Sequence, residues 1–143
     1  MKTLGKKFIT YDYGASSGRG MLADFDGEKL SLSEFHRFKN DPVFVIKHYY
    51  WDVLYLFNEL KKGLLTLSRS FKGDFASIGV DTWGVDFGLL DSKGMLISNP
   101  FYYRDSLTDG EPERVFNAVS REELYRRTGI QFLKINTLFQ LSA

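Results

Sequence analysis

The sequence predicts an α/β domain built on a mixed β-sheet, with three antiparallel strands at the N-terminus and flanking helices. Three observations favour this class. The first forty residues contain short runs of alternating residues separated by turn signals. A long amphipathic stretch follows, and a short apolar run comes directly after it. Hairpin-linked strands beside a strand–helix–strand crossover combine antiparallel and parallel pairs in one sheet.

Strands are expected at residues 8–13, 21–25 and 30–38. The third strand shows the alternation that is typical of a half-buried strand, with leucines at 30 and 32 between serines at 31 and 33. Asp26-Gly27 between the second and third runs is a strong signal for a two-residue hairpin turn. The Asn-Asp-Pro segment at 40–42 ends the strand pattern.

A helix is expected from Asp52, a suitable N-cap, to the Lys-Gly-Asp segment at 72–74. The nearly all-apolar run 75–80 then predicts a buried central strand. A second hairpin is expected from residues 87–90 and 95–97 around the turn 91–94. The helix prediction depends on apolar residues that recur at steps of three and four: Val53, Leu56, Phe57, Leu60, Leu64, Leu67 and Phe71.

The last third of the chain favours helices. One is expected at 111–119, with Pro112 in its first turn, where a missing N–H does no harm. Ser120 to Glu123 forms a capping box, and Gly129 is a typical helix stop. The apolar pattern continues to Ala143, so we expect the chain to be an incomplete part of a longer protein.

Composition narrows the class of protein. With 143 residues, 43% of them hydrophobic and 16% aromatic, the chain has the size of one domain and can bury a substantial core. A net charge of +1 gives no electrostatic case for nucleic acid or a membrane surface as a partner. There is no cysteine for a disulfide or a thiolate metal site, and no run approaches the ~20 apolar residues of a membrane helix. We expect a soluble, cytoplasmic protein with small-molecule ligands, and self-association through a truncated face.

The segment from Asp12 to Arg19 is the first candidate site. Glycines bracket two serines that can donate hydrogen bonds to phosphate, and Arg19 offers a planar guanidinium for the same anion. Asp12, at the end of the first strand, is placed to meet a metal ion beside that phosphate. The alternative is an ordinary hairpin turn rich in small residues, because Gly-Ser turns are common.

The free energy available to this loop limits what it can do alone. Hydrogen bonds to a charged group contribute roughly 1.5–3 kcal/mol each, so three of them reach about 5–9 kcal/mol. The loss of translational and rotational freedom on binding costs roughly 4–15 kcal/mol. We therefore expect the loop to be one wall of a cleft that other residues complete.

A second candidate group follows the apolar run directly. Ligands of α/β sheets gather at the carboxyl ends of strands, so Asp81 and Asp12 share an edge if their strands are adjacent. Trp83 offers a flat face to a sugar ring, and carboxylates such as that of Asp86 pair well with sugar hydroxyls. Gly84 would let a ligand approach the backbone. The alternative is that Trp83 is a core aromatic residue and Asp86 a hairpin residue.

The segment Tyr102 to Ser106 carries two adjacent charges. Arg104 and Asp105 cannot face a core unpaired, so a salt bridge between them is expected, and substrate contact is the alternative. His36 and His48 have no partner at metal-ligand spacing and are interpreted as non-catalytic.

Together these motifs resemble a known family. The order D-x-G-A-S-S-G-R, H-R-F, G-V-D-T-W-G-V-D-F, Y-R-D-S, R-R-T-G-I-Q-F and N-T-L-F-Q-L resembles the rhamnulokinases. These are sugar kinases of the FGGY carbohydrate kinase family, with the actin-like (ribonuclease H-like) ATPase fold. The resemblance covers essentially the whole chain, and it implies ATP-dependent phosphorylation of L-rhamnulose at O1 with Mg²⁺, in rhamnose catabolism.

The resemblance also implies residue roles. Asp12 would lie near the metal and the γ-phosphate, and Gly84 would contact the sugar in a pocket shaped by Trp83 and Asp81. Asp86, Arg104 and Asp105 are further candidates at that pocket. The ATP phosphates would face the loop residues Ala15, Ser16, Ser17, Gly18 and Arg19.

The sequence departs from the family pattern in two ways. Leu107 stands where the family usually has an arginine, which weakens the role of that loop. The family's catalytic base is an aspartate in a His-Asp pair, and here His36 precedes Arg37 and His48 precedes Tyr49. We therefore expect residues 1–143 to be a partial N-terminal lobe with no catalytic residue, without the second domain and inactive alone. Two alternatives are a kinase of the same family for another ketose or polyol, and a non-catalytic actin-like nucleotide-binding module.

Overall fold

The structure is a computed structural model that describes residues 5–143. It divides into two compact units, and the chain passes between them three times. The first unit holds the residues up to Asp41 together with Val53–Trp83. The second holds Pro42–Asp52 and Gly84–Ala143. The two units are described separately below.

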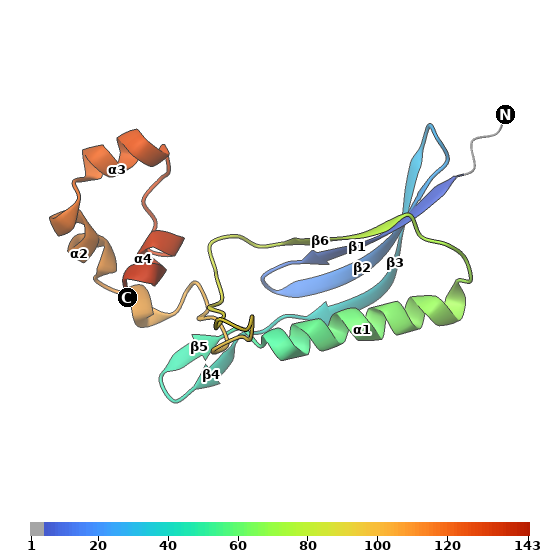
Figure 1. Cartoon of the computed structure of the whole chain (residues 1–143), viewed down its shortest axis with the longest axis horizontal. Coiled ribbons are helices and arrows are strands. Elements are labelled where there is room, and N and C mark those ends of the chain that lie inside the picture. The colour runs from blue at the N-terminus through green and yellow to red at the C-terminus, as the bar shows by residue number, and fades with distance from the viewer. Residues whose placement is uncertain (1–4) are drawn as a thin grey trace. The chain divides into compact units, whose positions relative to one another are not determined.

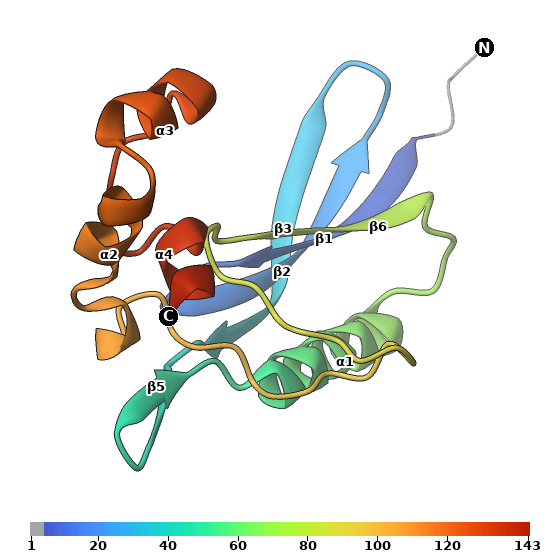
Figure 2. The same ribbon diagram turned by 60° about the vertical axis from the view of Figure 1, so that its left-hand side comes forward.

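A four-stranded mixed sheet forms the first unit. Its strands are β1 (Lys6–Tyr13), β2 (Ser17–Phe25), β3 (Leu30–Lys39) and β6 (Ser77–Thr82), in the order β3-β2-β1-β6. The first three pair antiparallel and β6 is parallel to β1, which confirms the predicted mixed sheet (Figure 1). Figure 2 shows β2 and β3 continuing as a long two-stranded ribbon to their turn.

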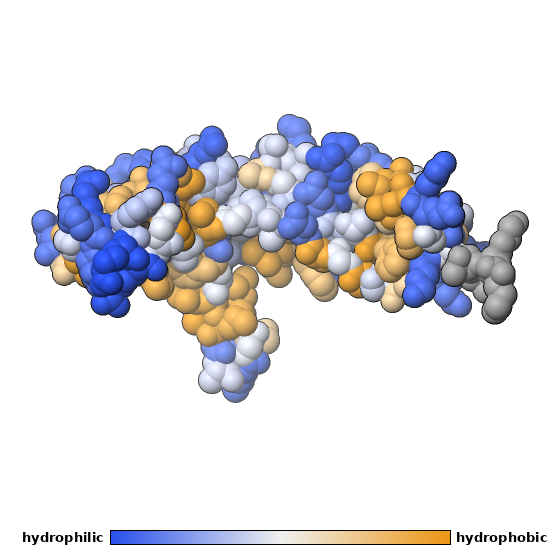
Figure 3. Space-filling model, turned by 90° about the horizontal axis from the view of Figure 1, so that it is seen from above, coloured by the Kyte–Doolittle hydropathy of each residue, from blue (hydrophilic) through white to orange (hydrophobic). Residues whose placement is uncertain are grey.

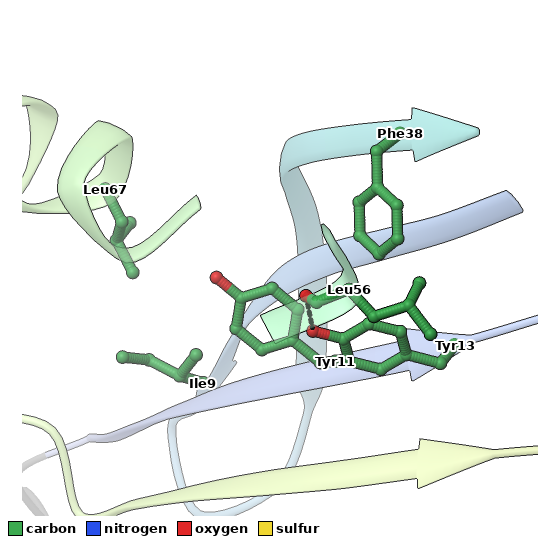
Figure 4. Packing of buried hydrophobic residues seen from close by; sticks show 6 residues of the cluster. All are labelled: Ile9, Tyr11, Tyr13, Phe38, Leu56 and Leu67. Atoms are coloured by element: carbon green, nitrogen blue, oxygen red, sulfur yellow. Dashed lines mark hydrogen bonds between the residues drawn. The ribbon is translucent and has the colours of Figure 1, made fainter. Parts of the chain in front are cut away.

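Helix α1 (Val53–Ser70) covers one face of this sheet (Figure 1). Tyr11 and Tyr13 point from β1 toward it, and their hydroxyls donate hydrogen bonds to the carbonyls of Leu60 (2.8 Å) and Leu56 (3.0 Å). Two tyrosines can therefore be buried without an unsatisfied hydroxyl. Figure 4 shows the buried cluster, which consists of Ile9, Tyr11, Tyr13, Phe38, Leu56 and Leu67.

The prediction of a buried central strand at 75–80 is wrong for this chain. Strand β6 pairs with β1 on one side only, so it forms an edge of the sheet, and all six of its residues are exposed. An all-apolar run is typical of a strand whose two faces are both covered by other elements. The run does not show which segment covers the strand. No other part of residues 5–143 pairs with the free edge of β6.

The second unit contains a hairpin that the sequence did not predict, β4 (Val43–Val45) and β5 (His48–Tyr50). The hairpin expected around 91–94 is reduced to a single bridge between Leu90 and Leu96. A short 3₁₀ helix, η1 (Ser106–Thr108), lies farther along the chain.

Three short helices complete the second unit: α2 (Glu111–Ala118), α3 (Arg121–Thr128) and α4 (Thr137–Ser142). The predicted caps are confirmed at α3, because the Ser120 side chain accepts a hydrogen bond from the Glu123 N–H and Gly129 is left-handed with φ 64°. Within residues 5–143, no helix is both long enough and apolar enough to cross a lipid bilayer.

Candidate functional site

The predicted phosphate loop is a tight connection between β1 and β2. Strand β2 begins at Ser17, earlier than expected, so only residues 14–16 lie outside the strands. The Gly14 N–H donates to the Ser17 carbonyl at 3.0 Å. Asn40 holds the loop from outside: its N–H donates to the Ser16 carbonyl (3.1 Å) and its side-chain amide to the Gly14 carbonyl (2.9 Å).

Sequence reasoning missed this role of Asn40, which was interpreted only as a residue that ends a strand. It is 2% exposed, and it connects the end of β3 to the loop. A buried polar side chain with satisfied hydrogen bonds rigidifies the segment that it contacts. The Asn-Asp-Pro signal gives no indication of this contact.

At the loop glycines the structure shows a close approach that a Cβ would prevent, whereas no unusual backbone angle requires them. Neither Gly14 nor Gly18 has a positive φ, so no left-handed turn requires them. A Cβ at Gly14 would lie 2.8 Å from the Ser17 carbonyl oxygen, and one at Gly18 would lie 2.1 Å from the Phe38 ring. Gly18 is therefore a packing residue for an aromatic ring.

A row of four charged residues crosses the sheet beside this loop. Asp12 pairs in register with Arg19 on β2 and with Asp81 on β6, and Arg19 pairs with Arg37 on β3. Since Tyr11 and Tyr13 point toward α1, the alternation of β1 places Asp12 and its neighbours on the opposite face. The expected adjacency of Asp12 and Asp81 is therefore present.

Arg19 and Asp12 form an ion pair within this row. Arg19 Nε lies 3.3 Å from Asp12 Oδ2, with side chains 42% and 47% exposed. The pair does not have the geometry of a hydrogen bond, and the buried Nε has no hydrogen-bond partner. The guanidinium is thus neutralised by Asp12, while its Nε has no hydrogen-bond partner among residues 5–143.

The carboxylates of Asp12 and Asp81 are groups of the type that bind Mg²⁺. Mg²⁺ is usually held by one or two carboxylates plus substrate phosphates, and the register places Asp12 and Asp81 side by side. Among residues 5–143, no cluster of three or more His, Cys, Asp or Glu side chains forms a complete metal site. A metal here would therefore depend on phosphate oxygens for its remaining ligands.

The motif 81–86 was expected to follow the strand, but β6 extends to Thr82 and so includes Asp81; the motif is divided between the two units. Asp81 and Trp83 end the first unit, where the Trp83 N–H donates to the Tyr13 carbonyl at 3.2 Å and its ring packs against the core. Gly84 begins the second unit, and a Cβ there would meet no atom of the described residues within 4 Å. Packing within residues 5–143 thus does not explain the glycine at 84.

Asp86 binds neighbours within the second unit. Its carboxylate accepts from the Trp51 indole N–H at 2.5 Å and from the Gln140 side-chain amide at 3.0 Å. Val85, before it, has a φ of 71°, which is unusual for a β-branched residue. Its carbonyl accepts from Thr137 Oγ1 at 2.6 Å, so α4 helps to hold the strained backbone.

The expected Arg104–Asp105 salt bridge is not formed. Asp105 instead pairs with His48 Nδ1 at 2.7 Å and accepts from the backbone N–H groups of Tyr49 (2.7 Å) and Leu107 (2.8 Å). Burial alone would raise the pKa of Asp105, but these hydrogen bonds outweigh it and lower that pKa. Arg104 lies over the Tyr103 ring at 5.3 Å. The local signal of adjacent charges was misleading, because the partner comes from a distant hairpin.

Two cavities of the second unit are apolar and avoid the predicted site residues. One, of about 350 Å³, lies between Phe87, Phe101 and Leu141. The other, of about 270 Å³, lies between Val85, Leu124 and Phe132. None of the residues predicted to bind phosphate, metal or sugar lines either of them.

The fold is shared with solved sugar kinases. A gluconate kinase from Lactobacillus acidophilus superposes with a TM-score of 0.78 at 18% identity, over 96% of this chain and 28% of the kinase. A xylulose kinase from the same organism gives a TM-score of 0.77 at 18% identity, over 95% of this chain and 27% of the kinase. The chain therefore has the fold of part of a sugar kinase, which confirms the predicted actin-like fold.

Sequence similarity points to one kind of sugar kinase. A curated rhamnulokinase from Mannheimia succiniciproducens is 50% identical over 92% of this chain. Another from Bacteroides thetaiotaomicron is 44% identical over 95% of it. The chain spans 28% of the length of each, and no protein-family model matches it. The resemblance to rhamnulokinases is confirmed, and it concerns a part of those enzymes.

Proposed function

We propose that this chain is part of the first lobe of a rhamnulokinase, which transfers a phosphoryl group from ATP to O1 of L-rhamnulose. The observation that carries the proposal is the row formed by Arg19, Asp12 and Asp81 at the end of β1. The identity of 40–50% to curated rhamnulokinases supports it. A cytoplasmic location, a second domain and a place in rhamnose catabolism follow from the same proposal.

In this proposal the loop holds the phosphates of ATP. The backbone and hydroxyl groups of Ala15, Ser16 and Ser17 face the phosphates, and Arg19 neutralises part of their charge. Asn40 holds the loop in place through the Gly14 and Ser16 carbonyls. Positioning and charge neutralisation are the main contributions that a protein makes to phosphoryl transfer.

Asp12 and Asp81 would hold Mg²⁺ beside the loop. When bound, the metal neutralises charge that develops on the transferred phosphoryl group. Gly84 would let the sugar approach the backbone, and the half-buried Trp83 would offer the sugar the part of its ring that does not pack against the core. No His-Asp pair occurs in the sequence, so the base that deprotonates the sugar hydroxyl is not among these residues.

A substrate panel on the longer protein that contains this chain tests the proposal. With ATP and Mg²⁺, we expect the highest kcat/KM for L-rhamnulose, compared with L-fuculose, xylulose and glycerol. Asp12→Asn should lower kcat by about 100-fold, because it removes a carboxylate ligand of the Mg²⁺ that neutralises the transferred phosphoryl group. Asp74→Asn, at an exposed aspartate, is the control. A preference for another sugar would identify a different kinase, and ATP binding without any sugar response would identify a non-catalytic module.

Residues 1–143 alone should give no turnover with L-rhamnulose and ATP. The reason is the missing base, and a coupled assay that follows ADP release measures it. Rhamnulose-dependent turnover from this chain alone would refute this part of the proposal.

A further inference from the structure

A β-bulge in β3 gives that strand an unusual distribution of charge. Gly20 on β2 pairs with His36 and Met21 pairs with Glu34, so Phe35 has no partner residue. In a regular strand, residues three apart lie on opposite faces. The extra residue changes this and places Glu34 and Arg37 on the same face.

That face is the one that carries Asp12 and Arg19. Arg37 lies directly opposite Arg19, and Glu34 lies opposite Met21. Neighbouring strands are about 4.8 Å apart, so the backbone of Arg37 is about 10 Å from that of Asp12, within reach of a long side chain. The Arg37 side chain is 52% exposed.

Both arginines of the row are neutralised by a carboxylate of the protein. Arg19 pairs with Asp12. Arg37 makes a bidentate contact with Glu34, with Nε to Oε1 at 3.0 Å and Nη2 to Oε2 at 2.5 Å. Because the two guanidinium groups lie on neighbouring strands, a phosphate that displaced Glu34 could contact both of them with its two negative charges.

We propose that Arg37 is a second phosphate-binding cation of this site, and that Glu34 competes with the bound phosphate for it. The proposal rests on the phosphate-binding role given to the loop above. An exposed ion pair contributes little to stability, whereas a bidentate contact of Arg with phosphate is a strong, charge-assisted one. Exchange of Glu34 for a phosphate oxygen therefore costs little. Lys39, which lies opposite Ser17, is a further exposed cation on the same side of the loop, and it pairs with Asp41 at 3.7 Å.

The proposal predicts opposite effects for the two partners. Arg37→Gln should weaken phosphate binding by about 10-fold, because it removes a hydrogen bond between charged groups. Glu34→Gln should strengthen binding by about 3-fold, because the competing carboxylate is gone. If the pair served only to join two surface side chains, both variants would change binding in the same way or not at all.

Titration of the longer protein that contains this chain tests this with two probes, sodium pyrophosphate and MgATP. Amide NMR shifts of Ala15, Ser16 and Ser17 give the dissociation constants, and thermal melting shows that each variant is folded. Arg126→Gln is a matched control, because Arg126 also pairs with a glutamate three residues before it.

The outcomes separate the two proposals. If the wild-type loop shows no shift with either probe, the loop does not bind phosphate and both proposals fail. If the wild type binds but Arg37→Gln binds equally well, the role of Arg37 is refuted while the loop assignment stands. The same refutation follows if Glu34→Gln weakens binding. Weaker binding by Arg37→Gln together with tighter binding by Glu34→Gln, and no change in Arg126→Gln, supports the role of Arg37.

Discussion

Gly63 lies in the middle of α1, where glycine is unfavourable for helix stability. Glycine inside a helix costs about 1 kcal/mol relative to alanine. A Cβ at this position would lie 2.3 Å from the Tyr11 hydroxyl and 3.1 Å from the His36 ring. The hydroxyl cannot move away freely, because it donates to the Leu60 carbonyl. The close contact between α1 and the sheet thus explains why glycine occupies position 63 despite its low helix propensity.

We expect Gly63→Ala to lower the free energy of unfolding by about 1–3 kcal/mol, the usual cost of an overpacked core. Gly79→Ala is the matched control, since no described atom lies within 4 Å of a Cβ there. That variant should be neutral or stabilising by about 0.5–1 kcal/mol. Urea denaturation measures both, and a stabilised Gly63→Ala would show that propensity dominates.

Glu59 is the acidic side chain buried between α1 and β3. It pairs with His36 at 2.9 Å and with Lys62 at 2.6 Å, and Tyr13 lies close by. Burial alone would raise the pKa of Glu59, but the hydrogen bonds and charges of Lys62 and His36 outweigh it and lower that pKa. The carboxylate partners of His36 and His48 could not be predicted from the sequence, because they belong to distant segments of the chain.

The lowered pKa of Glu59 determines in which direction the stability of the fold changes with pH. An ionised Glu59 stabilises the fold fully above the unfolded-state pKa of about 4.3, and this contribution is lost as the pH falls through the lower folded-state value. At pH 7, Glu59→Gln should cost about 1.5–3 kcal/mol. The difference from wild type should shrink below about pH 4. Chemical denaturation between pH 3 and 7 measures it, with the exposed Glu28→Gln as a control; a difference that does not depend on pH would contradict the mechanism.

At the scale of elements, the β4–β5 hairpin shows why a turn can escape prediction. Two-residue hairpin turns favour Asn or Gly because they need a positive φ. Here the turn contains Ile46, with a φ of 59° and 91% of its surface exposed. A β-branched residue is strongly disfavoured in this conformation, so nothing in the local sequence indicated a turn. The Asp26-Gly27 turn, by contrast, follows the rule and was predicted.

Replacing Ile46 with a residue that tolerates a positive φ should stabilise the protein. We expect Ile46→Asn to raise the free energy of unfolding by about 1 kcal/mol, because the left-handed conformation costs roughly 1–2 kcal/mol for most residues. Ile130→Asn, at another exposed isoleucine without a positive φ, should give no such gain. Thermal melting of both variants is the measurement, and equal melting temperatures would refute the strain at Ile46.

Strand β2 is another element whose start was misjudged. Gly18 and Gly20 suggested a long loop, but both lie inside the strand because aromatic rings fill the space above them. The rings belong to Phe38 and Phe35 of β3. A glycine in a strand is read correctly only when its neighbours on the next strand are known.

At the scale of the whole molecule, many large apolar side chains of residues 5–143 are exposed. Figure 3 shows hydrophobic patches among the polar residues on the face in view. On the edge strand β6, Ile78 is 50% and Val80 58% exposed. An exposed strand edge with apolar side chains favours association with another strand.

We therefore expect the isolated chain to self-associate through β6 at micromolar concentrations. Val80→Lys should shift it toward monomer, because a charge on an edge strand opposes pairing. Val119→Lys, at an exposed valine outside the sheet, should leave association unchanged. Light scattering after gel filtration measures the mass. A wild-type chain that is monomeric, with little binding of an apolar dye, would contradict the expectation.

The sequence by itself determined the local features of this protein. The stripe of α1, apart from Phe57, which is 58% exposed, depends on residues a few positions apart, as do the caps of α3 and the turn at Asp26. A local pattern was therefore enough to predict them. The motif residues that resemble rhamnulokinases were equally visible. Only the tertiary structure decided the row of Arg37, Arg19, Asp12 and Asp81, the exposed edge at β6 and the pairing of His48 with Asp105. These depend on strand order, on a bulge and on contacts between distant segments, because register and burial are set by the partners that a segment meets after folding.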